Sequence, residues 1–596
     1  MLFNITLKKG ISLKKIFIYA FIIVLIISVF PRCAKIVAPT GGPKDSLAPV
    51  LVRSVPAMNS TNFDGEKITL IFDEFIALKD YQKKLAISPP MVKNPEIIQR
   101  GKNIDIKFKE PLKKNTTYTI YFSDAVVDNN EGNPLKNFLF AFSTGSTIDS
   151  LTLSGKLRDA FTLLPVENVF VMLYDQNIDS LPIKSLPRYL TRTDKSGLFT
   201  FHNLQLKDYK IFALLDNNSN YKFDQATEDI AFIKGMVSKK GLTSPSKNDT
   251  TKKVVRTVNL NLFKEENRTQ ALIGFDRKQR RKITLTFTKN PEGKVKLNPL
   301  NFKADSSWYL IERNEKKDSL IYWITNNRIS SMDTLKIQLS YLKTDSLKRL
   351  QPKLDTVKYI YTDSEEPKRR RKDKDNDTPK KNTLKVDCNV KKDQPIVPYN
   401  PMVFTFPEPL RNFNESLIKI TNLKDTVDVK GLKLKLDSLS PRIYRIYSNW
   451  VPDVKYKLMV LPKAFTSLSG LDNDTLDVNF FGANPEKYGQ IILTFLNSPK
   501  RVVVELLNEK KDRVFDTRVS RNGEKVTFDY VTPGKYTLRI IEDTNGNGKW
   551  DTGWYLKGIQ PEKLIYYSDS KTKGVLNIRA NWENEISFDF AKQSKP

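Results

Sequence analysis

Cysteine and histidine are almost absent from this sequence. Its 596 residues include only two cysteines and one histidine. No disulfide framework can form, so stability must come from hydrophobic cores. The single histidine, His202, has no second imidazole with which to hold zinc, and a Ser-His-Asp triad has no other histidine to use. We expect His202 to be a half-exposed strand residue, and we expect the protein not to be an enzyme.

Other signals of catalysis are missing too. No glycine-rich phosphate loop follows any predicted strand. Asp73 and Glu74 are adjacent carboxylates, but neighbouring strand residues point to opposite faces, so this pair cannot flank one glycosidic bond. After the N-terminal region no segment has a helical period. The sequence therefore offers no candidate catalytic residue.

The residues that are abundant suit strands. The 34 Phe and 23 Tyr far outnumber the 6 Trp and 8 Met, a bias that favours β structure. Hydrophobic residues make up 39% of the chain, enough for every module to bury a core. The length suggests about four to five domains. We predict an all-β protein of tandem β-sandwiches.

The first thirty residues have the layout of an export signal. Lys8, Lys9, Lys14 and Lys15 precede an unbroken apolar run, Ile16–Phe30. That run is shorter than the about 20 residues needed to span a bilayer, and Pro31 ends it. We predict a signal peptide at 1–32, a lipidated Cys33 and a tether at 33–48. Arg32 stands where a small residue is usual, so an uncleaved single-pass anchor is the alternative.

From Glu66 onward the hydrophobic period is two, as in strands of a sandwich. Four stretches in this region carry a more specific signal: Ile71–Phe75, Ile87–Pro90, Leu112–Thr119 and Asp128–Asn133. Together with Phe142–Gly145 they resemble the SbsA-type bacterial Ig-like domain, and Pro39–Asp45 resembles the leader of Bacteroidetes-type lipoproteins that carry it. The resemblance is specific over residues 33–235. It implies an outer-membrane lipoprotein without known catalytic residues.

The second module has a different pattern of strands and turns. Leu151–Leu157, Asp194–Phe201 and Leu204–Leu215 are similar to a prealbumin-like or Cna B-like sandwich. Later segments repeat the patterns of both modules. Met402–Leu410, for example, has the pattern of the strand ending at Phe72. The predicted order is an Ig-like domain at 49–147, a prealbumin-like sandwich at 148–235, a linker at 236–264, an Ig-like β domain at 265–364, a charged linker at 365–383, a second Ig-like domain at 384–485 and a second prealbumin-like sandwich at 486–596.

Two acidic loops lie seven residues after Tyr209 and Tyr536 and could bind calcium. In the later loop Asp543, Asn545, Asn547 and Asp551 occupy positions 1, 3, 5 and 9 of an EF-hand-type loop. Gly548 stands at position 6 and the Lys549 carbonyl at position 7. Position 12 is Trp554, so the usual glutamate is missing and a neighbour such as Glu542 would have to replace it.

The earlier loop has Asp216, Asn218, Asn220 and Asp224 at the same positions, with Tyr221 in place of the glycine and Glu228 nearby. The alternative for both loops is a hairpin turn that uses Asn and Asp for positive φ angles. With Asn at two ligand positions, calcium affinity would suit only extracytoplasmic concentrations, about 10⁻⁴ to 10⁻³ M.

Three aromatic residues beside the later loop, Trp550, Trp554 and Tyr555, are candidates for a glycan platform or for a hydrophobic plug beneath the turn. The second cysteine, Cys388, lies in an alternating stretch, Leu384–Val390, and is predicted to be a small core residue rather than a reactive thiol.

The formal net charge is +31, with denser basic runs at 277–282 and 368–374. An exported protein would rarely meet nucleic acid, so we expect no nucleic-acid partner. The charge is either solvated surface lysine or an attraction for phosphate-bearing headgroups and acidic partners.

The sequence thus indicates a structural or adaptor lipoprotein with envelope protein partners. The alternatives are an accessory subunit of an outer-membrane assembly or export complex and a glycan-binding surface lipoprotein. Residues Ala34–Val37 contain no acid, which favours the periplasmic face of the outer membrane. No oligomeric state is predicted.

Overall fold

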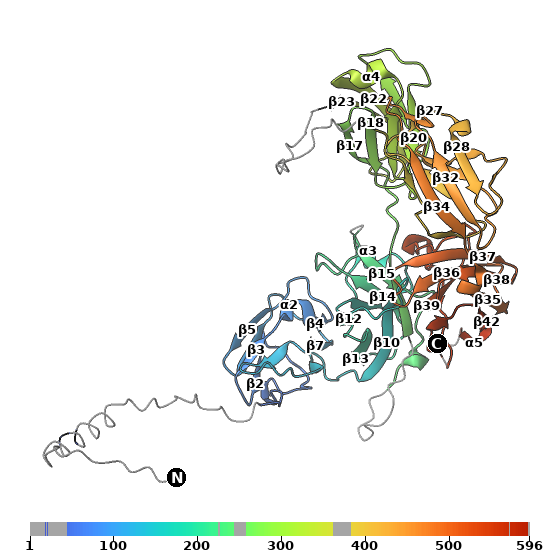
Figure 1. The fold of residues 1–596 in the computed structure, drawn as a ribbon. Coiled ribbons are helices and arrows are strands. Elements are labelled where there is room, and N and C mark those ends of the chain that lie inside the picture. Colours follow the sequence, from blue (N-terminus) through green and yellow to red (C-terminus); the bar gives the residue numbers. More distant parts are fainter. Residues whose placement is uncertain are drawn as a thin grey trace, which may run out of the picture. The chain divides into compact units, whose positions relative to one another are not determined.

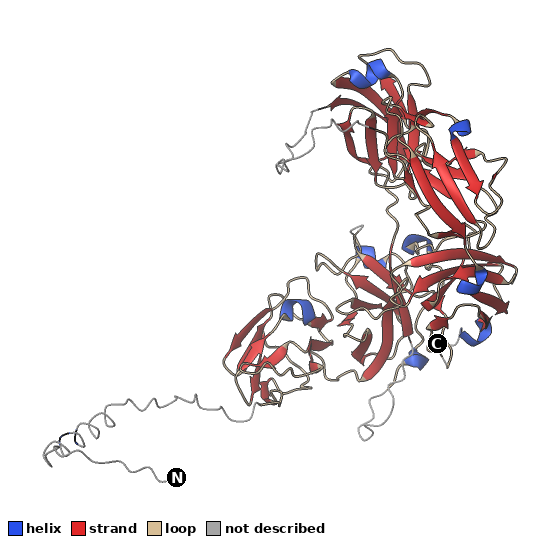
Figure 2. Ribbon diagram, viewed as in Figure 1, coloured by secondary structure: helices blue, strands red, loops and turns tan. Residues whose placement is uncertain are grey.

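A computed structural model describes residues 45–224, 227–243, 258–361, 383–570 and 572–593, together with Ile18 and Phe21 (Figure 1). The predicted signal peptide, Cys33 and most of the tether lie outside these residues, as does the charged linker up to residue 382. No helix among the described residues is long and apolar enough to cross a membrane. Strands are the main regular structure of the described chain, connected by loops and accompanied by a few short helices (Figure 2), so the all-β prediction is confirmed.

The chain divides into two compact units, residues 1–85 with 91–147, and residues 86–90 with 148–596. The first contains module A, residues 45–147 without 86–90. One sheet has the order β1-β2-β6-β5, and two antiparallel pairs, β3 with β8 and β7 with β9, complete it. The bounds are β1 Leu51–Val55, β2 Lys67–Phe72, β3 Ile76–Leu78, α2 Tyr81–Lys84, β5 Glu96–Arg100, β6 Asn103–Lys107, β7 Thr117–Ser123, β8 Val126–Asp128 and β9 Phe138–Ser143. The short strand β4 (Ala86–Ser88) belongs to the second unit.

Period-two burial builds this module. In β2 the side chains of Ile68, Leu70 and Phe72 are buried, while those between them are not. The Asp128–Asn133 motif also has a structural reason. The buried Asp128 carboxylate accepts the backbone N–H groups of residues 130 to 133 at 2.6–3.0 Å and so fixes the turn after β8.

Module B (148–264) contains one continuous seven-stranded sheet path, β12-β11-β14-β15-β16-β10-β13. Its elements are β10 Leu151–Asp159, β11 Phe170–Tyr174, α3 Leu181–Lys184, β12 Tyr189–Arg192, β13 Leu198–Leu204, β14 Lys210–Leu215, β15 Asp229–Phe232, η1 Lys239–Gly241 and β16 Val258–Lys264. The predicted linker 236–264 is wrong at both described ends. Strand β16 pairs in parallel with β10 and buries Leu260 and Leu262, and Val237 is buried beside Tyr209.

Module C (265–361) has two sheets, β17-β18-β21-β20 and β19-β22-β23. Its elements are β17 Leu272–Gln279, β18 Lys282–Phe287, β19 Lys296–Pro299, β20 Tyr309–Arg313, β21 Ser319–Ile324, α4 Asn327–Ser331, β22 Thr334–Thr344 and β23 Leu350–Ile360. Its core includes Trp308, Tyr322 of β21 and Ile337 of β22, all of which are buried.

Module A′ (383–485) has the sheets β24-β26-β31-β30 and β25-β34-β32-β28-β29 and the pair β27-β33. The bounds are β24 Asp387–Cys388, β25 Pro395–Ile396, β26 Met402–Thr405, β27 Leu410–Phe413, η2 Glu415–Leu417, β28 Ile418–Asn422, β29 Val427–Asp428, β30 Leu434–Leu436, β31 Ile443–Ile446, β32 Lys455–Val460, β33 Phe465–Ser467 and β34 Leu476–Gly482.

Module B′ (486–593) has the sheet β38-β35-β42 and a second sheet, β37-β36-β39-β40, in which β41 also pairs with β39. The bounds are η3 Pro485–Lys487, β35 Gly489–Leu496, β36 Arg501–Asn508, β37 Val514–Arg521, β38 Val526–Val531, β39 Gly534–Glu542, η4 Tyr555–Lys557, β40 Leu564–Tyr566, β41 Leu576–Ile578, β42 Glu583–Asp589 and α5 Phe590–Gln593.

Tyrosine hydroxyls mark the repeated two-module unit. In modules A and A′, Tyr118 and Tyr456 accept the backbone N–H of the residue five positions earlier, at 2.9 and 3.0 Å. In modules B and B′, Tyr209 and Tyr536 donate to the carbonyl four positions earlier, at 2.8 and 2.9 Å. A tyrosine that ties a strand to the preceding loop is a recurrent feature of β-sandwiches. The hydrogen bonds therefore match the repetition read from the sequence.

Modules C and A′ meet at a buried ion pair. Glu312 of β20 accepts hydrogen bonds from Arg442 Nε and Nη2 at 2.9 and 2.6 Å, and others from Trp323 Nε1 and Ser440 Oγ. Burial alone would raise the pKa of the Glu312 carboxyl. Hydrogen bonds from Arg442, Trp323 and Ser440, together with the charge of Arg442, hold this pKa below its ordinary value.

We predict that Glu312→Gln destabilises the junction of C and A′ by about 3 kcal/mol at pH 7, because it leaves the partly buried Arg442 without its counterion. A depressed carboxylate pKa contributes stability above its ordinary value of 4.5, and this contribution is lost as the pH falls through the lower folded value. The difference in free energy of unfolding between wild type and variant should therefore shrink as the pH falls. Urea unfolding of the full chain between pH 7 and pH 3 measures it.

The matched control is Glu315→Gln, three residues along and exposed. Equal stability of the two variants at pH 7, or a Glu312→Gln gap that does not change with pH, would contradict the role given to the ion pair.

Candidate functional site

The later acidic loop is organised around the buried carboxylate of Asp543. Its two oxygens accept the backbone N–H groups of Gly546, Asn547 and Gly548 at 2.7–3.1 Å. The amides of Asn545 and Asn547 both donate to Asp551 Oδ2, at 2.6 and 2.5 Å. The predicted ligand side chains are thus brought together, on the turn between β39 and η4.

Glu562 braces the same loop from outside it. This buried carboxylate accepts the N–H and hydroxyl of Thr544 through one oxygen and the N–H of Asp551 through the other. The sequence offers Glu542 as the additional carboxylate, but Glu542 pairs with Lys563 instead, at 3.0 Å. Sequence reasoning misses Glu562 because it lies beyond the span of an EF-hand pattern.

The earlier loop has the same construction. Asp216 accepts the N–H groups of Asn218, Ser219 and Tyr221 at 2.7–3.1 Å. The amides of Asn218 and Asn220 donate to Asp224. Glu228, buried, accepts the N–H of the residue after Asp216 and the N–H of Asp224, as Glu562 does in the later loop.

Backbone angles agree between the loops. Positions 4 and 6 have positive φ in both, at Gly546 and Gly548 in the later loop and at Ser219 and Tyr221 in the earlier one. A side chain in this left-handed region costs about 1–2 kcal/mol relative to glycine. The Tyr221 ring offsets the cost by packing edge-on against Phe170, with ring centroids 5.0 Å apart.

Each loop also has an arginine that interacts electrostatically with its first aspartate. Arg501 Nε lies 2.8 Å from Asp543 Oδ2. In the earlier loop burial lowers the pKa of Arg192 to about 10, while Tyr221 and Asp216 act in the opposite direction. The first carboxylate of each loop therefore already has a cationic neighbour, and a bound cation would share it.

These contacts fit both interpretations of the loops. The side chains of Asp543, Asn545, Asn547 and Asp551 lie together as a calcium loop requires, but the asparagine amides turn their N–H groups towards Asp551, and these contacts also satisfy a turn without a metal. Among the described residues no three His, Cys, Asp or Glu side chains form a group that could hold a metal ion by themselves. Calcium would depend on asparagine oxygens and backbone carbonyls, such as that of Lys549, and it stays a prediction.

The aromatic residues beside the later loop face inward. Tyr555 is 1% exposed and lies in a hydrophobic cluster of module B, with Phe212, Phe232 and Phe263. Trp550 packs against Phe161 of module B, at 5.0 Å between ring centroids. These aromatics form a plug, as one of the two sequence interpretations proposes, but the plug enters a second module rather than lying beneath its own turn.

Trp554 is partly buried beneath two cations. The Arg268 guanidinium lies 3.5 Å from its ring centroid and the Lys557 ammonium lies 4.0 Å away. Its ring is therefore engaged in cation–π contacts, and the three aromatics do not present an open platform for a sugar ring.

Isolated residues singled out from the sequence have ordinary settings. His202 is exposed on β13. Cys388 lies in the core of module A′, as predicted, and burial raises the pKa of its thiol to about 11. Asp73 is exposed at the end of β2, where its carboxylate accepts the Val50 N–H at 2.8 Å.

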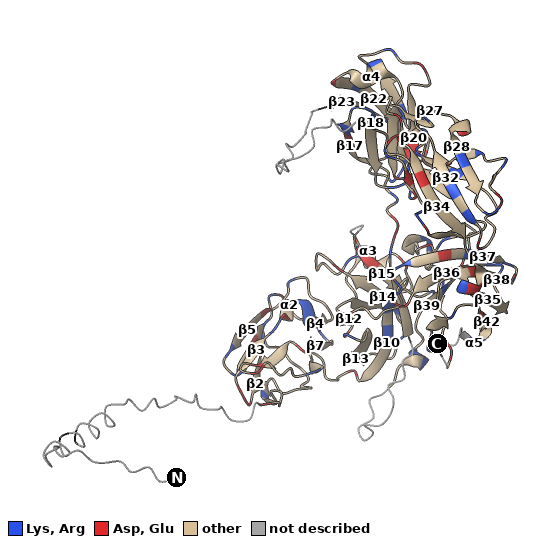
Figure 3. Ribbon diagram, viewed as in Figure 1, with Lys and Arg blue, Asp and Glu red and all other residues tan. Residues whose placement is uncertain are grey.

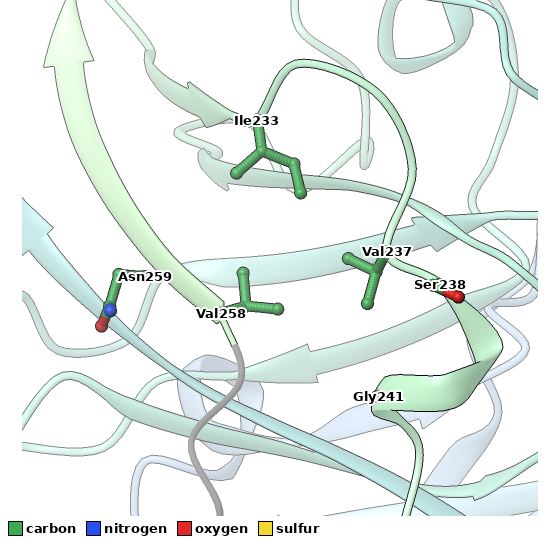
Figure 4. Close-up of a pocket in the computed structure, with 6 residues that line it drawn as sticks. All are labelled: Ile233, Val237, Ser238, Gly241, Val258 and Asn259. Carbon is green, nitrogen blue, oxygen red and sulfur yellow. The ribbon is translucent and has the colours of Figure 1, made fainter. Parts of the chain in front are cut away.

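One cavity of about 300 Å³ opens on module B (Figure 4). Its walls are Ile233, Val237, Ser238, Gly241, Val258 and Asn259. None of these residues has an ionisable side chain, so the cavity offers a small apolar surface and no acid, base or charged nucleophile.

Basic residues are spread over all the modules (Figure 3). The dense run at 277–282 has a structural use. Arg277 is buried and donates to the carbonyls of Arg280, Ser330 and Met332 at 2.7–3.0 Å. Arg281 donates to Ile324 O, and Arg280 pairs with Asp333. These guanidiniums hold the segment around α4, so the run is not a free basic surface. The second dense run, at 368–374, lies outside the described residues.

Comparisons with known proteins identify two segments. Residues 45–144 match the family described as bacterial Ig-like domain. Residues 478–562 match a family described as an uncharacterized protein conserved in bacteria (DUF2141). No curated protein matches the chain in sequence.

Solved structures of low similarity include a segment of α2-macroglobulin from Escherichia coli, 12% identical with a TM-score of 0.16, covering 33% of this chain and 90% of that one. The S-layer protein rSbsC is 12% identical with a TM-score of 0.13, covering 88% and 67%. A titin segment is 10% identical with a TM-score of 0.13, covering 53% and 96%. Such TM-scores carry no conclusion about function. The chain is a multi-module β protein whose first module matches the bacterial Ig-like domain family.

Proposed function

We propose that this protein is a non-catalytic structural or adaptor lipoprotein of the bacterial outer membrane, facing the periplasm. Cys33 would hold the lipid, and the five modules would present loops to envelope protein partners at a distance from the membrane. The observation that carries this proposal is the recurrence of one two-module unit, with its tyrosine hydrogen bonds, around module C. Many cell-surface domains are β-sandwiches whose loops cluster at the two ends, an arrangement that suits display.

The contacts at conspicuous polar residues support the non-catalytic part of the proposal. Asp543 and Asp216 hold turns, Glu312 joins two modules, and Arg277 binds backbone carbonyls. The glycan-binding alternative has lost its aromatic platform, because Tyr555 and Trp550 pack against module B. Stable co-purification with an outer-membrane protein would favour the accessory-subunit alternative over a general spacer.

We predict that Cys33→Ser abolishes lipid attachment. Labelling cells with a palmitate analogue should mark the wild-type protein in the outer-membrane fraction, and the variant should be unlabelled and lost from that fraction. The control is Cys388→Ser, which removes the buried cysteine of module A′ and should leave labelling intact. Labelled Cys33→Ser, or unlabelled wild type, would overturn the anchor.

We also propose that the two acidic loops bind calcium at extracytoplasmic concentrations. For a dissociation constant of about 10⁻⁴ to 10⁻³ M, about 5 mM calcium should stabilise the folded chain by about 1–2 kcal/mol per site. Thermal unfolding of the full chain in calcium and in chelator measures this shift. Asp551→Asn and Asp224→Asn should each remove part of it.

Asp512→Asn is the matched control, because Asp512 is an exposed aspartate in another turn of module B′. If wild type shows no thermal shift in millimolar calcium, the loops are turns only. An equal shift in magnesium would contradict a calcium site.

A further inference from the structure

We infer that modules B and B′ form one closed unit, a joint locked by Tyr555, and that this joint fixes the base of an arm made of modules C and A′. The two modules are separated in sequence by that whole arm. Figure 1 shows B and B′ side by side, B in teal and green and B′ in red. The inference goes beyond spacing, because it makes the second unit a ring of modules rather than a string.

Tyr555 is the centre of the joint. It stands at the start of η4 in module B′, and its ring lies edge-on to Phe212, Phe223 and Phe232 of module B at centroid distances of 5.5–5.8 Å. Its hydroxyl donates to the Asp179 carbonyl, and its backbone N–H donates to Glu265 Oε1. A tyrosine that is buried in a neighbouring module with its hydroxyl satisfied is a strong anchor.

A second patch widens the contact. Phe161 and Leu163 of module B pack on Val503, Ile541 and Leu564 of module B′, and the Arg539 guanidinium lies 4.4 Å from the Phe161 ring centroid.

Close backbone approach adds to this. A Cβ at Gly553 would lie 2.6 Å from the Phe263 ring, so only glycine fits there. The backbone of module B′ therefore approaches the Phe263 ring of module B closely at this point.

Hydrogen bonds place the joint at the root of the arm. Thr552 Oγ1 donates to the Lys264 carbonyl at 2.6 Å, and Gln560 Nε2 donates to the Phe232 carbonyl at 2.8 Å. Lys264 ends the last strand of module B, and Glu265 begins the arm. Module B′ therefore holds the point at which the chain leaves module B.

Both acidic loops adjoin this joint. Phe223 belongs to the earlier loop and touches Tyr555, and Trp550 belongs to the later loop and touches Phe161. The turns that the loops make are thus the walls of the joint, which explains why both are braced by a buried glutamate.

The hydrogen-bonded partners of the joint are 288 to 376 residues apart in sequence. Tyr555 is synthesised after module B and the arm, so the joint can form only when nearly the whole chain has been made. Once the joint is closed, a load applied to the arm acts on B and B′ together. Backbone N–H groups of one module should therefore be protected from hydrogen exchange by a side chain of the other.

Hydrogen–deuterium exchange of the full chain tests the joint. Tyr555→Ala should speed exchange by about tenfold or more in β15 and β16 of module B, because local opening there would no longer require the joint to separate. Tyr555→Phe keeps the ring and should stay close to wild type. Leu556→Ala, the next residue and 61% exposed, is the control and should change nothing.

A variant in module B distinguishes loss of the joint from misfolding of module B′ alone. Phe223→Ala in module B should speed exchange in residues 552–560 of module B′. If Tyr555→Ala affects only peptides of B′, or Phe223→Ala only peptides of B, the modules are independent and the joint does not exist. A Leu556→Ala effect equal to that of Tyr555→Ala would overturn the inference as well.

Discussion

The arrangement of the second unit depends on one packed side chain, Tyr555. Its ring carries an apolar contact between modules B and B′, its backbone N–H donates to Glu265, and the nearby Thr552 hydroxyl donates to the Lys264 carbonyl. Removing a ring of this size from water contributes about 1.5–3 kcal/mol, a large share of the stability of any one module. The aromatic group that the sequence offers as a ligand platform is therefore better explained as the contact that closes a ring of modules.

Charge has a similar internal use. Glu312 with Arg442 joins C to A′, Arg277 holds the segment around α4, and Asp543 with Arg501 fixes a turn. Polar groups that are conspicuous in the sequence thus make contacts within and between modules. These contacts support the proposed display role, because they leave the exposed loops as the parts available to a partner.

Much of the fold can be predicted from period-two patterns such as Lys67–Phe72, because alternate burial is a local property. The correspondence of Tyr209 with Tyr536 is also visible in the sequence. The sequence of strand β16 indicates a linker because the interaction that makes it a strand is non-local. This interaction is a parallel pairing with β10, about a hundred residues earlier. Glu312 escapes sequence reasoning for the same reason, since its partner Arg442 lies 130 residues away and no local motif joins them. Glu562 is missed because it lies beyond the span of an EF-hand pattern.

The most direct test of the closed unit is a distance between its two modules. Spin labels at Leu206→Cys in B and Trp582→Cys in B′, both exposed sites, can be placed in the full chain with Cys33 and Cys388 replaced by serine. Pulsed dipolar spectroscopy should give one narrow distance distribution, and Tyr555→Ala should broaden it. A broad distribution already present with Tyr555 in place would contradict the account.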